Sequence, residues 1–425
     1  MRVLRLAAGG RTRGEVWLPG SKSLSNRFLL LSALCSQPTL LSPLPDSADV
    51  AHLRQALCDL GLSLEAEAEG WRVQPVPLDD WRSGELFLGN AGTAMRPLAA
   101  VLSMLPGQFV LAGEPRMHER PIGPLVEALR QWGAQIEYLG EESYPPLRIH
   151  GRRLPGGVCQ LDPTLSSQFV SALLMAAPLL QGPGEIVLQA PLVSAPYVDL
   201  TLAQMARFGV QVEVAAGRYR TQPQSYRSPG RVRVEGDATA ASYFLAAGAV
   251  GGGPVRVNGV GRDTTQGELA FAEVLQQMGA RVRWGSGWVE CSSPPQGTLR
   301  GLDVDLNALP DSAMTLATTA LFCQGSCSIR GVENWRVKEC DRQRALHDEL
   351  LKLGAEVEML ADGLKVAPPR RWQTQPIATY GDHRMAMCFS LAALGPVEID
   401  IEDPDCVNKT YPGYFEDFAR IRSWT

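Results

Sequence analysis

Hydrophobic residues along the chain follow two alternating periods, one typical of helices and the other typical of strands. Apolar helical stretches run from Ser166 to Leu180, from Asp237 to Val250 and from Asp311 to Phe322. Each is followed by a short strand-like segment, such as Glu185–Gln189, and then by a second helical stretch. Because both periods are regular, this order predicts a mixed α/β chain.

A marker residue shows that this order repeats. Five times a helical stretch runs into a glycine, which is the residue that a helix C-terminus favours. Successive marker glycines are 70 to 76 residues apart, so the repeat is much longer than that of a solenoid array. The glycines are Gly61, Gly133, Gly209, Gly279 and Gly354. The repeat predicts a series of related units, each a small piece of a domain.

The last unit looks incomplete. It opens at Asp382, reaches the helical stretch Tyr414–Ile421 and stops before its final strand. The strand-like N-terminal segments, residues 2–6 and 15–18, can complete it. We therefore expect a domain made from both ends of the chain and a second domain from its middle.

This organisation sets the expected domain boundaries. The discontinuous domain takes residues 1–19 plus 236–425 and the central domain takes residues 20–235, with crossovers near 19–20 and 234–236. Two domains joined by two strands are able to hinge. A plain multi-domain α/β enzyme remains the alternative.

Composition narrows the classes of function. The 425 residues carry a net charge of -5, so neither nucleic acid nor a membrane surface is an expected partner. Nine cysteines without a Cys-x-x-C pair indicate reduced thiols, and five scattered histidines argue against a zinc site. No signal-type segment and no bilayer-length apolar run is present. We expect a soluble cytoplasmic protein without a bound metal.

The segment Leu18–Arg27 combines two cations with three serines just before the apolar run 28–34. A helix start presents unpaired N–H groups and a positive dipole end, both of which favour a phosphate or a carboxylate. Lys22 adds a point charge, Arg27 a planar fork and Ser23 a hydroxyl. The Walker pattern is absent, so a nucleoside triphosphate is not implied. A serine-capped helix with two solvated cations explains the segment equally well.

Other units open on similar polar segments. Gly89 and Gly92 precede a helical stretch and let backbone amides approach a ligand, although a glycine turn capped by Thr93 is the alternative. The loop 113–122 contains Arg120 and could belong to an anion site, but a solvated loop explains it equally well. Hydroxyls and an amide that suit a polyol or a phosphate, or that cap helices, follow at Ser166, Ser167, Gln168, Ser194 and Tyr197.

The segment 334–342 holds the densest charge. If it starts a helix, Lys338 and Arg342 face the same way, which costs about 0.2–0.5 kcal/mol unless an anion lies between them. Glu339 and Asp341 could neutralise them instead. Asp311, Asp237 and Asp382 each precede a helical stretch, and a helix-capping role is favoured for any one of them. Arg384 and Lys409 add cations at two further junctions.

Such sites recur at the openings of units in both halves of the chain. A single one would carry little weight, but six or more indicate a cleft between two domains whose helix N-termini converge on polyanionic ligands. The alternative is a set of independently capped helices with solvated charges.

Several motifs together resemble the 5-enolpyruvylshikimate-3-phosphate synthase family, the 3-phosphoshikimate 1-carboxyvinyltransferases, from Leu18 to Pro412. They are Pro-Gly-Ser-Lys-Ser, Gly-Asn-Ala-Gly-Thr-Ala-Met-Arg-Pro, Arg-Pro-Ile, Asn-Trp-Arg-Val-Lys-Glu and Asp-His-Arg-Met-Ala-Met. The resemblance implies two similar domains, each of three βαβαββ units in an inside-out α/β barrel, with the active site in the cleft between domains. It also implies a monomer that needs no cofactor and no metal.

The resemblance further implies a reaction in the shikimate pathway towards aromatic amino acids. The enolpyruvyl group of phosphoenolpyruvate is transferred to the 5-hydroxyl of shikimate 3-phosphate through a tetrahedral adduct, with release of phosphate. Asp311 is then the expected base, Glu339 the expected acid, and Lys22 shares in proton transfer. Because Gly92 is retained, the family's usual sensitivity to glyphosate is expected.

Ligand-binding roles follow by motif match. Shikimate 3-phosphate is expected at Lys22, Ser23, Arg27, Ser166, Ser167, Gln168, Ser194, Tyr197, Asp311, Asn334 and Lys338. Phosphoenolpyruvate is expected at Lys22, Gly92, Arg120, Gln168, Arg342, Arg384 and Lys409. The chain departs from the commonest bacterial pattern at Leu24, Ala195, Gly381, Cys340 and residues 408–411, and Ala195 removes a cation often found beside the shikimate site.

Two rival functions remain. The UDP-N-acetylglucosamine enolpyruvyl transferases resemble this chain, but that family normally places a catalytic cysteine in the loop corresponding to Glu114–Arg120, which here has none. A non-catalytic anion-binding protein on the same scaffold would not need Asp311 and Glu339 beside the cations.

Overall fold

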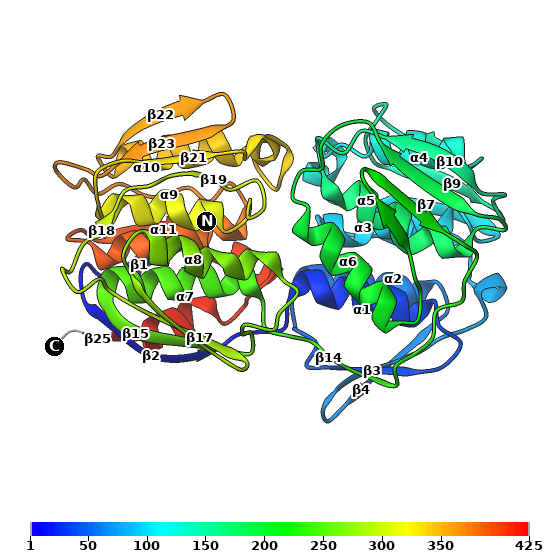
Figure 1. Cartoon of the computed structure of the whole chain (residues 1–425), viewed down its shortest axis with the longest axis horizontal. Coiled ribbons are helices and arrows are strands. Elements are labelled where there is room, and N and C mark those ends of the chain that lie inside the picture. The colour runs from blue at the N-terminus through cyan, green and yellow to red at the C-terminus, as the bar shows by residue number, and fades with distance from the viewer. Residues whose placement is uncertain (1, 424–425) are drawn as a thin grey trace. The chain divides into compact units, whose positions relative to one another are not determined.

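The computed structural model describes residues 2–423, and the chain divides into two compact units. Unit 1 comprises Met1–Pro19 and Glu235–Thr425, and unit 2 comprises Gly20–Val234. Figure 1 shows the elements of both units. Among residues 2–423, no helix is both long and apolar enough to cross a bilayer.

Unit 2 repeats one sheet topology three times. In each sheet a strand pairs in parallel with its neighbour, which in turn pairs with an antiparallel hairpin. In order across each sheet, the strands are β14 (Arg231–Arg233), β3 (Thr39–Ser42), β5 (Gly70–Gln74) and β4 (Ser63–Glu67); β6 (Gly84–Phe87), β7 (Gly107–Ala112), β9 (Leu147–Gly151) and β8 (Gln135–Tyr138); and β10 (Gly157–Leu161), β11 (Gly184–Leu188), β13 (Arg218–Thr221) and β12 (Glu213–Ala215).

The helices of unit 2 differ in burial: those that begin at Lys22, Gly92 and Ser167 are buried along nearly their whole length, and the others bury one face. The helices are α1 (Lys22–Ala33), α2 (Ala48–Asp59), α3 (Gly92–Leu102), α4 (Gly123–Gln131), α5 (Ser167–Ala176) and α6 (Pro196–Arg207), with short 3₁₀ turns η1 (Leu78–Asp80), η2 (Pro115–Glu119) and η3 (Ala177–Leu179).

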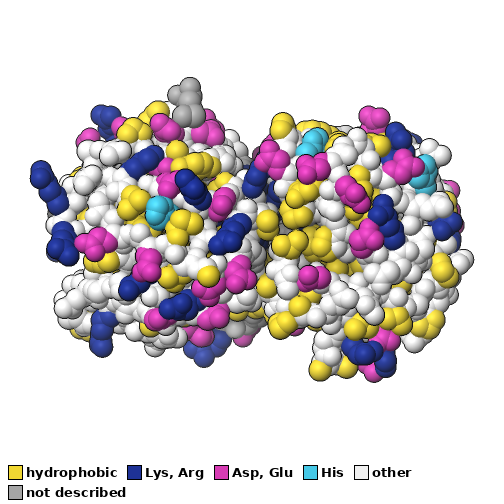
Figure 2. All heavy atoms as spheres, turned by 90° about the horizontal axis from the view of Figure 1, so that it is seen from above, with side chains coloured by type: hydrophobic (Ala, Val, Ile, Leu, Met, Phe, Trp, Pro, Cys, Tyr) yellow, Lys and Arg dark blue, Asp and Glu magenta, His cyan; other side chains and the backbone are white. Residues whose placement is uncertain are grey.

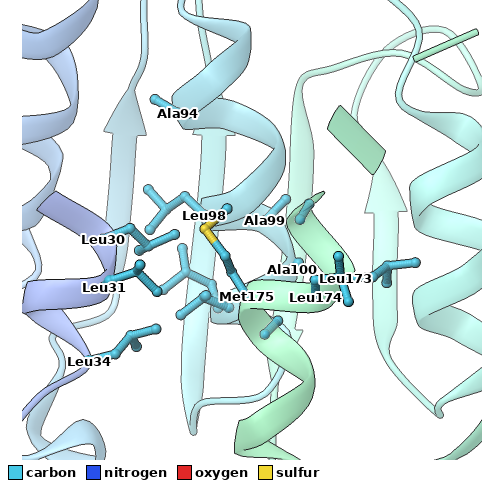
Figure 3. Close-up of a cluster of buried hydrophobic side chains, with 14 of the residues drawn as sticks. Leu30, Leu31, Leu34, Ala94, Leu98, Ala99, Ala100, Leu173, Leu174 and Met175 are labelled. Carbon is cyan, nitrogen blue, oxygen red and sulfur yellow. The ribbon is translucent and has the colours of Figure 1, made fainter. Parts of the chain in front are cut away.

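The core of unit 2 lies where α1, α3 and α5 meet. Figure 3 shows Leu30 of α1, Leu98 of α3 and Met175 of α5 pointing toward one another, and each is at most 1% exposed. Burying such a side chain stabilises the fold by roughly 1.5–3 kcal/mol. This packing fixes the three helices side by side, so the site residues at the N-terminal ends of α1, α3 and α5 are carried on a rigid scaffold.

Unit 1 uses the same sheet topology. Its strands are β16 (Arg281–Gly285), β17 (Trp288–Ser292), β15 (Gly252–Asn258), β2 (Arg11–Trp17) and β25 (Arg422–Ser423) in one sheet; β19 (Asp303–Asp305), β21 (Cys327–Arg330), β23 (Gly363–Ala367) and β22 (Glu356–Leu360) in a second; and the pairs β1 (Val3–Leu6) with β24 (Ile399–Glu402) and β18 (Leu299–Arg300) with β20 (Cys323–Gln324).

Unit 1 also has helices in its interior, and Figure 1 shows α7, α9 and α11 running between its sheets. The helices are α7 (Ala238–Gly251), α8 (Phe271–Gln277), α9 (Ala313–Thr319), α10 (Arg342–Lys352), α11 (His383–Ser390) and α12 (Tyr414–Arg420), with 3₁₀ turns η4 (Gly267–Ala270), η5 (Ala320–Phe322), η6 (Glu333–Val337), η7 (Leu391–Leu394) and η8 (Pro404–Lys409).

The N-terminal strand completes the last repeat. Ile377 bridges Ile401 of β24 in parallel, and β1 pairs with β24 in the antiparallel direction. These two partners occupy the places that the parallel strand and the hairpin take in the other repeats. The sequence prediction that the N-terminus supplies the missing strand is confirmed for residues 2–6, but it was wrong for residues 15–18, because β2 pairs with β15 in another sheet. The prediction that the chain stops before a further strand was wrong, because β25 follows α12 and pairs with β2.

The five marker glycines end helices as the sequence predicted. All have a positive φ, between 81° and 105°, immediately after the last turns of α2, α4, α6, α8 and α10. This left-handed conformation reverses the chain and favours glycine because other residues carry a Cβ that clashes there.

Candidate active site

The first site segment of unit 2 lies at the start of α1, as its sequence predicted. The Ser21 side chain caps the helix by accepting a hydrogen bond from Leu24 N, 3.4 Å away. Lys22, the first helical residue, is 7% exposed, and its Nζ lies 3.2 Å from Asp49 Oδ2. The alternative of two solvated cations was wrong, because Lys22 and Arg27 are both buried.

Arg27 reaches across unit 2 to α6. Its Nε donates to Thr201 Oγ1 at 2.8 Å, and its Nη atoms donate to the carbonyls of Ser23 and Tyr197 at 3.0 and 3.2 Å. These partners are neutral, so they orient the guanidinium without cancelling its charge. Burial lowers the pKa of Arg27 to about 10. Because this value is still well above 7, Arg27 stays cationic at neutral pH. A buried cation of this kind favours the binding of an anion.

Gly92 leaves space among three polar side chains. A Cβ at this position would overlap Arg96 Nη1 and would come within 2.9 Å of Arg120 Nη2 and 3.2 Å of Gln168 Oε1. The cap of α3 is Ala91, without a side-chain hydrogen bond, so the threonine-cap alternative was wrong. Thr93 instead accepts a hydrogen bond from Asn26 Nδ2 at 2.7 Å.

The groups around Gly92 are held by one another. Arg96 Nη1 donates to Gln168 Oε1 at 3.0 Å, and Arg96 Nη2 donates to Pro121 O at 3.0 Å. Arg120 Nη1 donates to both oxygens of Asn90, at 2.9 and 2.7 Å. Arg120 is 3% exposed, so the solvated-loop alternative was wrong. Two guanidinium groups and an amide therefore surround a position that only glycine leaves open.

The predicted hydroxyl groups of unit 2 have different surroundings. The Ser166 side chain caps α5 by accepting from Gln168 N at 3.2 Å, which is the capping alternative. Ser167 is buried in the first turn of α5. Ser194 is also buried and has a φ of +53°, a conformation uncommon outside glycine. Tyr197 packs against the core and turns its carbonyl to Arg27.

In unit 1, Asp311 is the centre of a charged cluster. Its Oδ1 accepts from Arg342 Nη1 and its Oδ2 from Arg384 Nη2, each at 2.8 Å, and Lys338 Nζ lies 3.9 Å from Oδ1. Burial alone would raise the pKa of Asp311, but the charges of these three cations outweigh it and hold the pKa well below its usual range. Asp311 is therefore a carboxylate in the resting protein.

Arg342 joins this cluster to two further carboxylates. Its Nη2 donates to Glu339 Oε2 at 2.8 Å, and its Nε donates to Asp382 Oδ2 at 2.7 Å. Asp382 also caps α11 by accepting from Arg384 N at 2.9 Å. The expected capping role is confirmed for Asp382, and likewise for Asp237, whose side chain accepts from Ala240 N. It was wrong for Asp311, since Ser312 is the cap residue of α9.

Lys338 and Arg342 converge by a route that the sequence did not predict. A 3₁₀ turn, η6, ends before Lys338, and α10 begins only at Arg342, so the two cations are not on one helix face. They meet because both side chains point to Asp311. Asn334 is buried in η6, and Lys409 is the last residue of η8.

Sequence reasoning missed several residues of these clusters. Arg96 belongs to the motif Gly-Asn-Ala-Gly-Thr-Ala-Met-Arg-Pro and follows Gly92 by four residues on α3. This helical spacing could have indicated that Arg96 lies beside Gly92. Asp49 and Glu268 gave no such signal in the sequence. Glu268 is buried and accepts from Asp311 N at 3.3 Å and Ser312 N at 2.9 Å, so it takes the place of a cap for α9.

Charges of both signs are interspersed on the molecular face drawn in Figure 2. No broad basic area is seen among the described residues on this face. Within residues 2–423, no group of three or more His, Cys, Asp or Glu side chains is arranged to hold a metal ion.

Known proteins resemble this chain over nearly its whole length. A model of the EPSP synthase (3-phosphoshikimate 1-carboxyvinyltransferase) family matches residues 6–418. The chain belongs to the EPSP synthase family. It is 51% identical over 432 residues to the 3-phosphoshikimate 1-carboxyvinyltransferase of Klebsiella pneumoniae, covering 99% of each chain. It is 52% identical over 434 residues to that of Bordetella bronchiseptica, covering 99% of this chain and 98% of the relative.

Solved structures agree with this family assignment. The EPSP synthase of Acinetobacter baumannii is 26% identical, with a TM-score of 0.81 over 99% of this chain and 98% of that one. The enolpyruvyl transferase NikO of Streptomyces tendae, at 19% identity and a TM-score of 0.77, shares the fold. The predicted family and the enolpyruvyl transferase fold are confirmed.

Proposed function

We propose that this protein transfers the enolpyruvyl group of phosphoenolpyruvate to the 5-hydroxyl of shikimate 3-phosphate and releases phosphate. A bond forms between the hydroxyl oxygen and C2 of phosphoenolpyruvate while a proton adds to C3. The tetrahedral adduct then loses a proton from the C3 methyl group and expels phosphate, which restores the vinyl group. The observation that carries the proposal is the Asp311 cluster, in which a buried carboxylate is held between two arginines.

Asp311 is proposed as the base for the 5-hydroxyl. In the resting protein it is a poor base, because Arg384, Lys338 and Arg342 stabilise its ionised form. An anionic substrate that binds these cations shares their charge, so the proton affinity of Asp311 rises as the substrate arrives. The base is therefore strengthened when phosphoenolpyruvate, the proposed ligand of Arg342 and Arg384, arrives.

Glu339 is proposed as the acid that protonates C3. It is 8% exposed and adjoins the same guanidinium as Asp311, since Arg342 Nη2 donates to its Oε2 at 2.8 Å. Base and acid thus contact different nitrogens of one rigid side chain. Lys22 is proposed to share in proton transfer, and its ammonium is oriented by Asp49 at 3.2 Å.

Phosphoenolpyruvate is proposed to bind the cations at Gly92 and beside Asp311. Arg120 and Gln168 surround the space at Gly92. Planar guanidinium groups match the paired oxygens of phosphate and carboxylate, and several cations offset the repulsion between two crowded anions. The further proposed contacts are Lys22, Arg342, Arg384 and Lys409.

Shikimate 3-phosphate is proposed to bind mainly through side-chain hydroxyls and cations. Arg27 supplies a buried positive charge that neutral oxygens orient. The other proposed contacts are Lys22, Ser23, Ser166, Ser167, Gln168, Ser194, Tyr197, Asp311, Asn334 and Lys338.

The test measures phosphate release from phosphoenolpyruvate with shikimate 3-phosphate as acceptor, and then with UDP-N-acetylglucosamine. We expect release only with shikimate 3-phosphate, and at least about 10²-fold slower release by Asp311→Asn. Release only with the sugar nucleotide would overturn the proposal. No release with either acceptor, from protein that binds both shikimate 3-phosphate and phosphoenolpyruvate, would favour the non-catalytic anion-binding alternative.

A further inference from the structure

Glu349, in the third turn of α10, is a fully buried carboxylate that the proposed reaction does not use. Its Oε1 accepts a hydrogen bond from the Tyr380 hydroxyl at 2.7 Å. Its Oε2 accepts from Ala378 N at 3.0 Å and from Lys352 Nζ at 2.7 Å. Three donors thus offset the cost of burying the charge, and two of them belong to the segment just before α11.

That segment has an unusual backbone. Tyr380 has a φ of +54° and Gly381 a φ of +67°, so two successive residues adopt the left-handed conformation. A tyrosine is disfavoured there because its Cβ approaches the following carbonyl oxygen, and such a residue persists only where its surroundings hold it. Tyr380 is 47% exposed, so packing holds it only in part and the hydrogen bond to Glu349 supplies a fixed contact.

The turn leads directly into the charged cluster. The next residue, Asp382, caps α11 through Arg384 N and accepts from Arg342 Nε. Arg384 in turn contacts Asp311. Helix α10 therefore holds the segment 378–382 at two points: Arg342, its first residue, binds the end of the segment, and Glu349, about two turns later, binds its beginning.

We propose that Glu349 and Tyr380 are positioning residues for the reaction, because their hydrogen bond sets the turn that places Asp382 and Arg384. Neither touches the reacting atoms, and the effect reaches them through Arg384. The inference rests on the proposed function in one respect, namely that Arg384 binds phosphoenolpyruvate.

The test compares Tyr380→Phe, which removes only the hydroxyl, with Glu349→Gln. Glu290→Gln is the control, because Glu290 is a similarly buried carboxylate in β17 whose partners are Arg256 and Arg283. We expect both test variants to raise KM for phosphoenolpyruvate about fivefold. The KM for shikimate 3-phosphate should change less than about twofold, and the control should leave both KM values unchanged.

Equal rises in both KM values, or a lower melting temperature with unchanged KM, would indicate a structural role and overturn the inference. If Glu349→Gln does not fold, Tyr380→Phe decides the question alone, since it changes a half-exposed side chain. A wild-type protein that releases no phosphate would refute the proposed function instead. In that case amide hydrogen exchange at residues 378–386 decides, because the inference expects faster exchange in Tyr380→Phe and unchanged exchange overturns it.

Discussion

Arg384 Nη2 and Asp311 Oδ2 form a 2.8 Å ion pair between the first turn of α11 and the residue just before the cap of α9. Arg342 holds the other oxygen of the same carboxylate at the same distance. Asp311 is thereby locked in its ionised form and in one orientation. The resting protein therefore holds this carboxylate, the proposed base, in ion pairs with two arginines.

Acid stability should reveal this ion pair. An aspartate in the unfolded chain titrates near pH 3.9, and the cations hold the pKa of folded Asp311 well below that value. Asp311 therefore contributes stability that is fully present above about pH 4 and is lost as the pH falls through its folded pKa. We expect the melting temperature of Asp311→Asn to fall less than that of the wild type between pH 5 and pH 3.

The control for this measurement is Asp303→Asn, which removes an exposed partner of Arg330 at the surface of unit 1. Its melting temperature should follow the wild-type pH dependence. Parallel curves for wild type and Asp311→Asn would contradict the ion-pair explanation.

Lys22→Met should lower the rate of phosphate release by about 10²-fold or more, because it removes the ammonium that Asp49 orients at the start of α1. Methionine keeps most of the side-chain volume but removes the ion pair with the buried Asp49, so a lower melting temperature is also expected. Steady-state phosphate release measures the effect, and Lys365→Met, at an exposed position of β23, is the matched control. A near-normal rate for Lys22→Met would reject its part in proton transfer.

Glu339→Ala should also slow phosphate release by about 10²-fold or more, since it removes the proposed proton donor beside Arg342. The exposed Glu358→Ala in β22 serves as control. Single-turnover measurements should show that the loss lies in the chemical step. An unchanged single-turnover rate would assign Glu339 to orienting Arg342 alone.

Gly92→Ala should raise KM for phosphoenolpyruvate about tenfold and weaken inhibition by glyphosate. The added Cβ would meet Arg96 Nη1 and Arg120 Nη2 well inside contact distance, so both flexible side chains must move. Gly84→Ala is a matched control, because a Cβ there meets nothing within 4 Å. Inhibition by glyphosate should be competitive with phosphoenolpyruvate in the wild type; insensitivity at high inhibitor concentration would contradict this expectation.

Helices and strands were predictable from local sequence wherever the hydrophobic period and the helix-end signals agreed. The stretch 166–180 became α5 and η3, and the marker glycines lie at helix ends with positive φ. Both results depend on interactions between near neighbours in the sequence, which local patterns record. The pairing of β1 with β24 was also foreseeable, because a repeat with one missing strand leaves one position of its sheet for a strand from elsewhere in the chain.

Local sequence could not distinguish a capping aspartate from one at the centre of a charged cluster. Asp237, Asp311 and Asp382 all precede helices, yet only Asp311 turns its carboxylate to arginines from two other elements. Asp49 and Glu268 carried no sequence signal, because their partners are distant in the chain. Arg96 could have been found from its spacing to Gly92, but its bond to Gln168 could not.

The sequence by itself determined the α/β repeat, the family and the cationic residues that open its units, since these follow from short-range patterns and from residue identity. Only the tertiary structure decided which charges meet. Asp311 is ionised because α10 and α11 bring Arg342 and Arg384 to it. The space at Gly92 is bordered by two arginines, which a side chain at this position would meet. Charge interactions depend on distance and burial, and both are set when helices from separate repeats pack together.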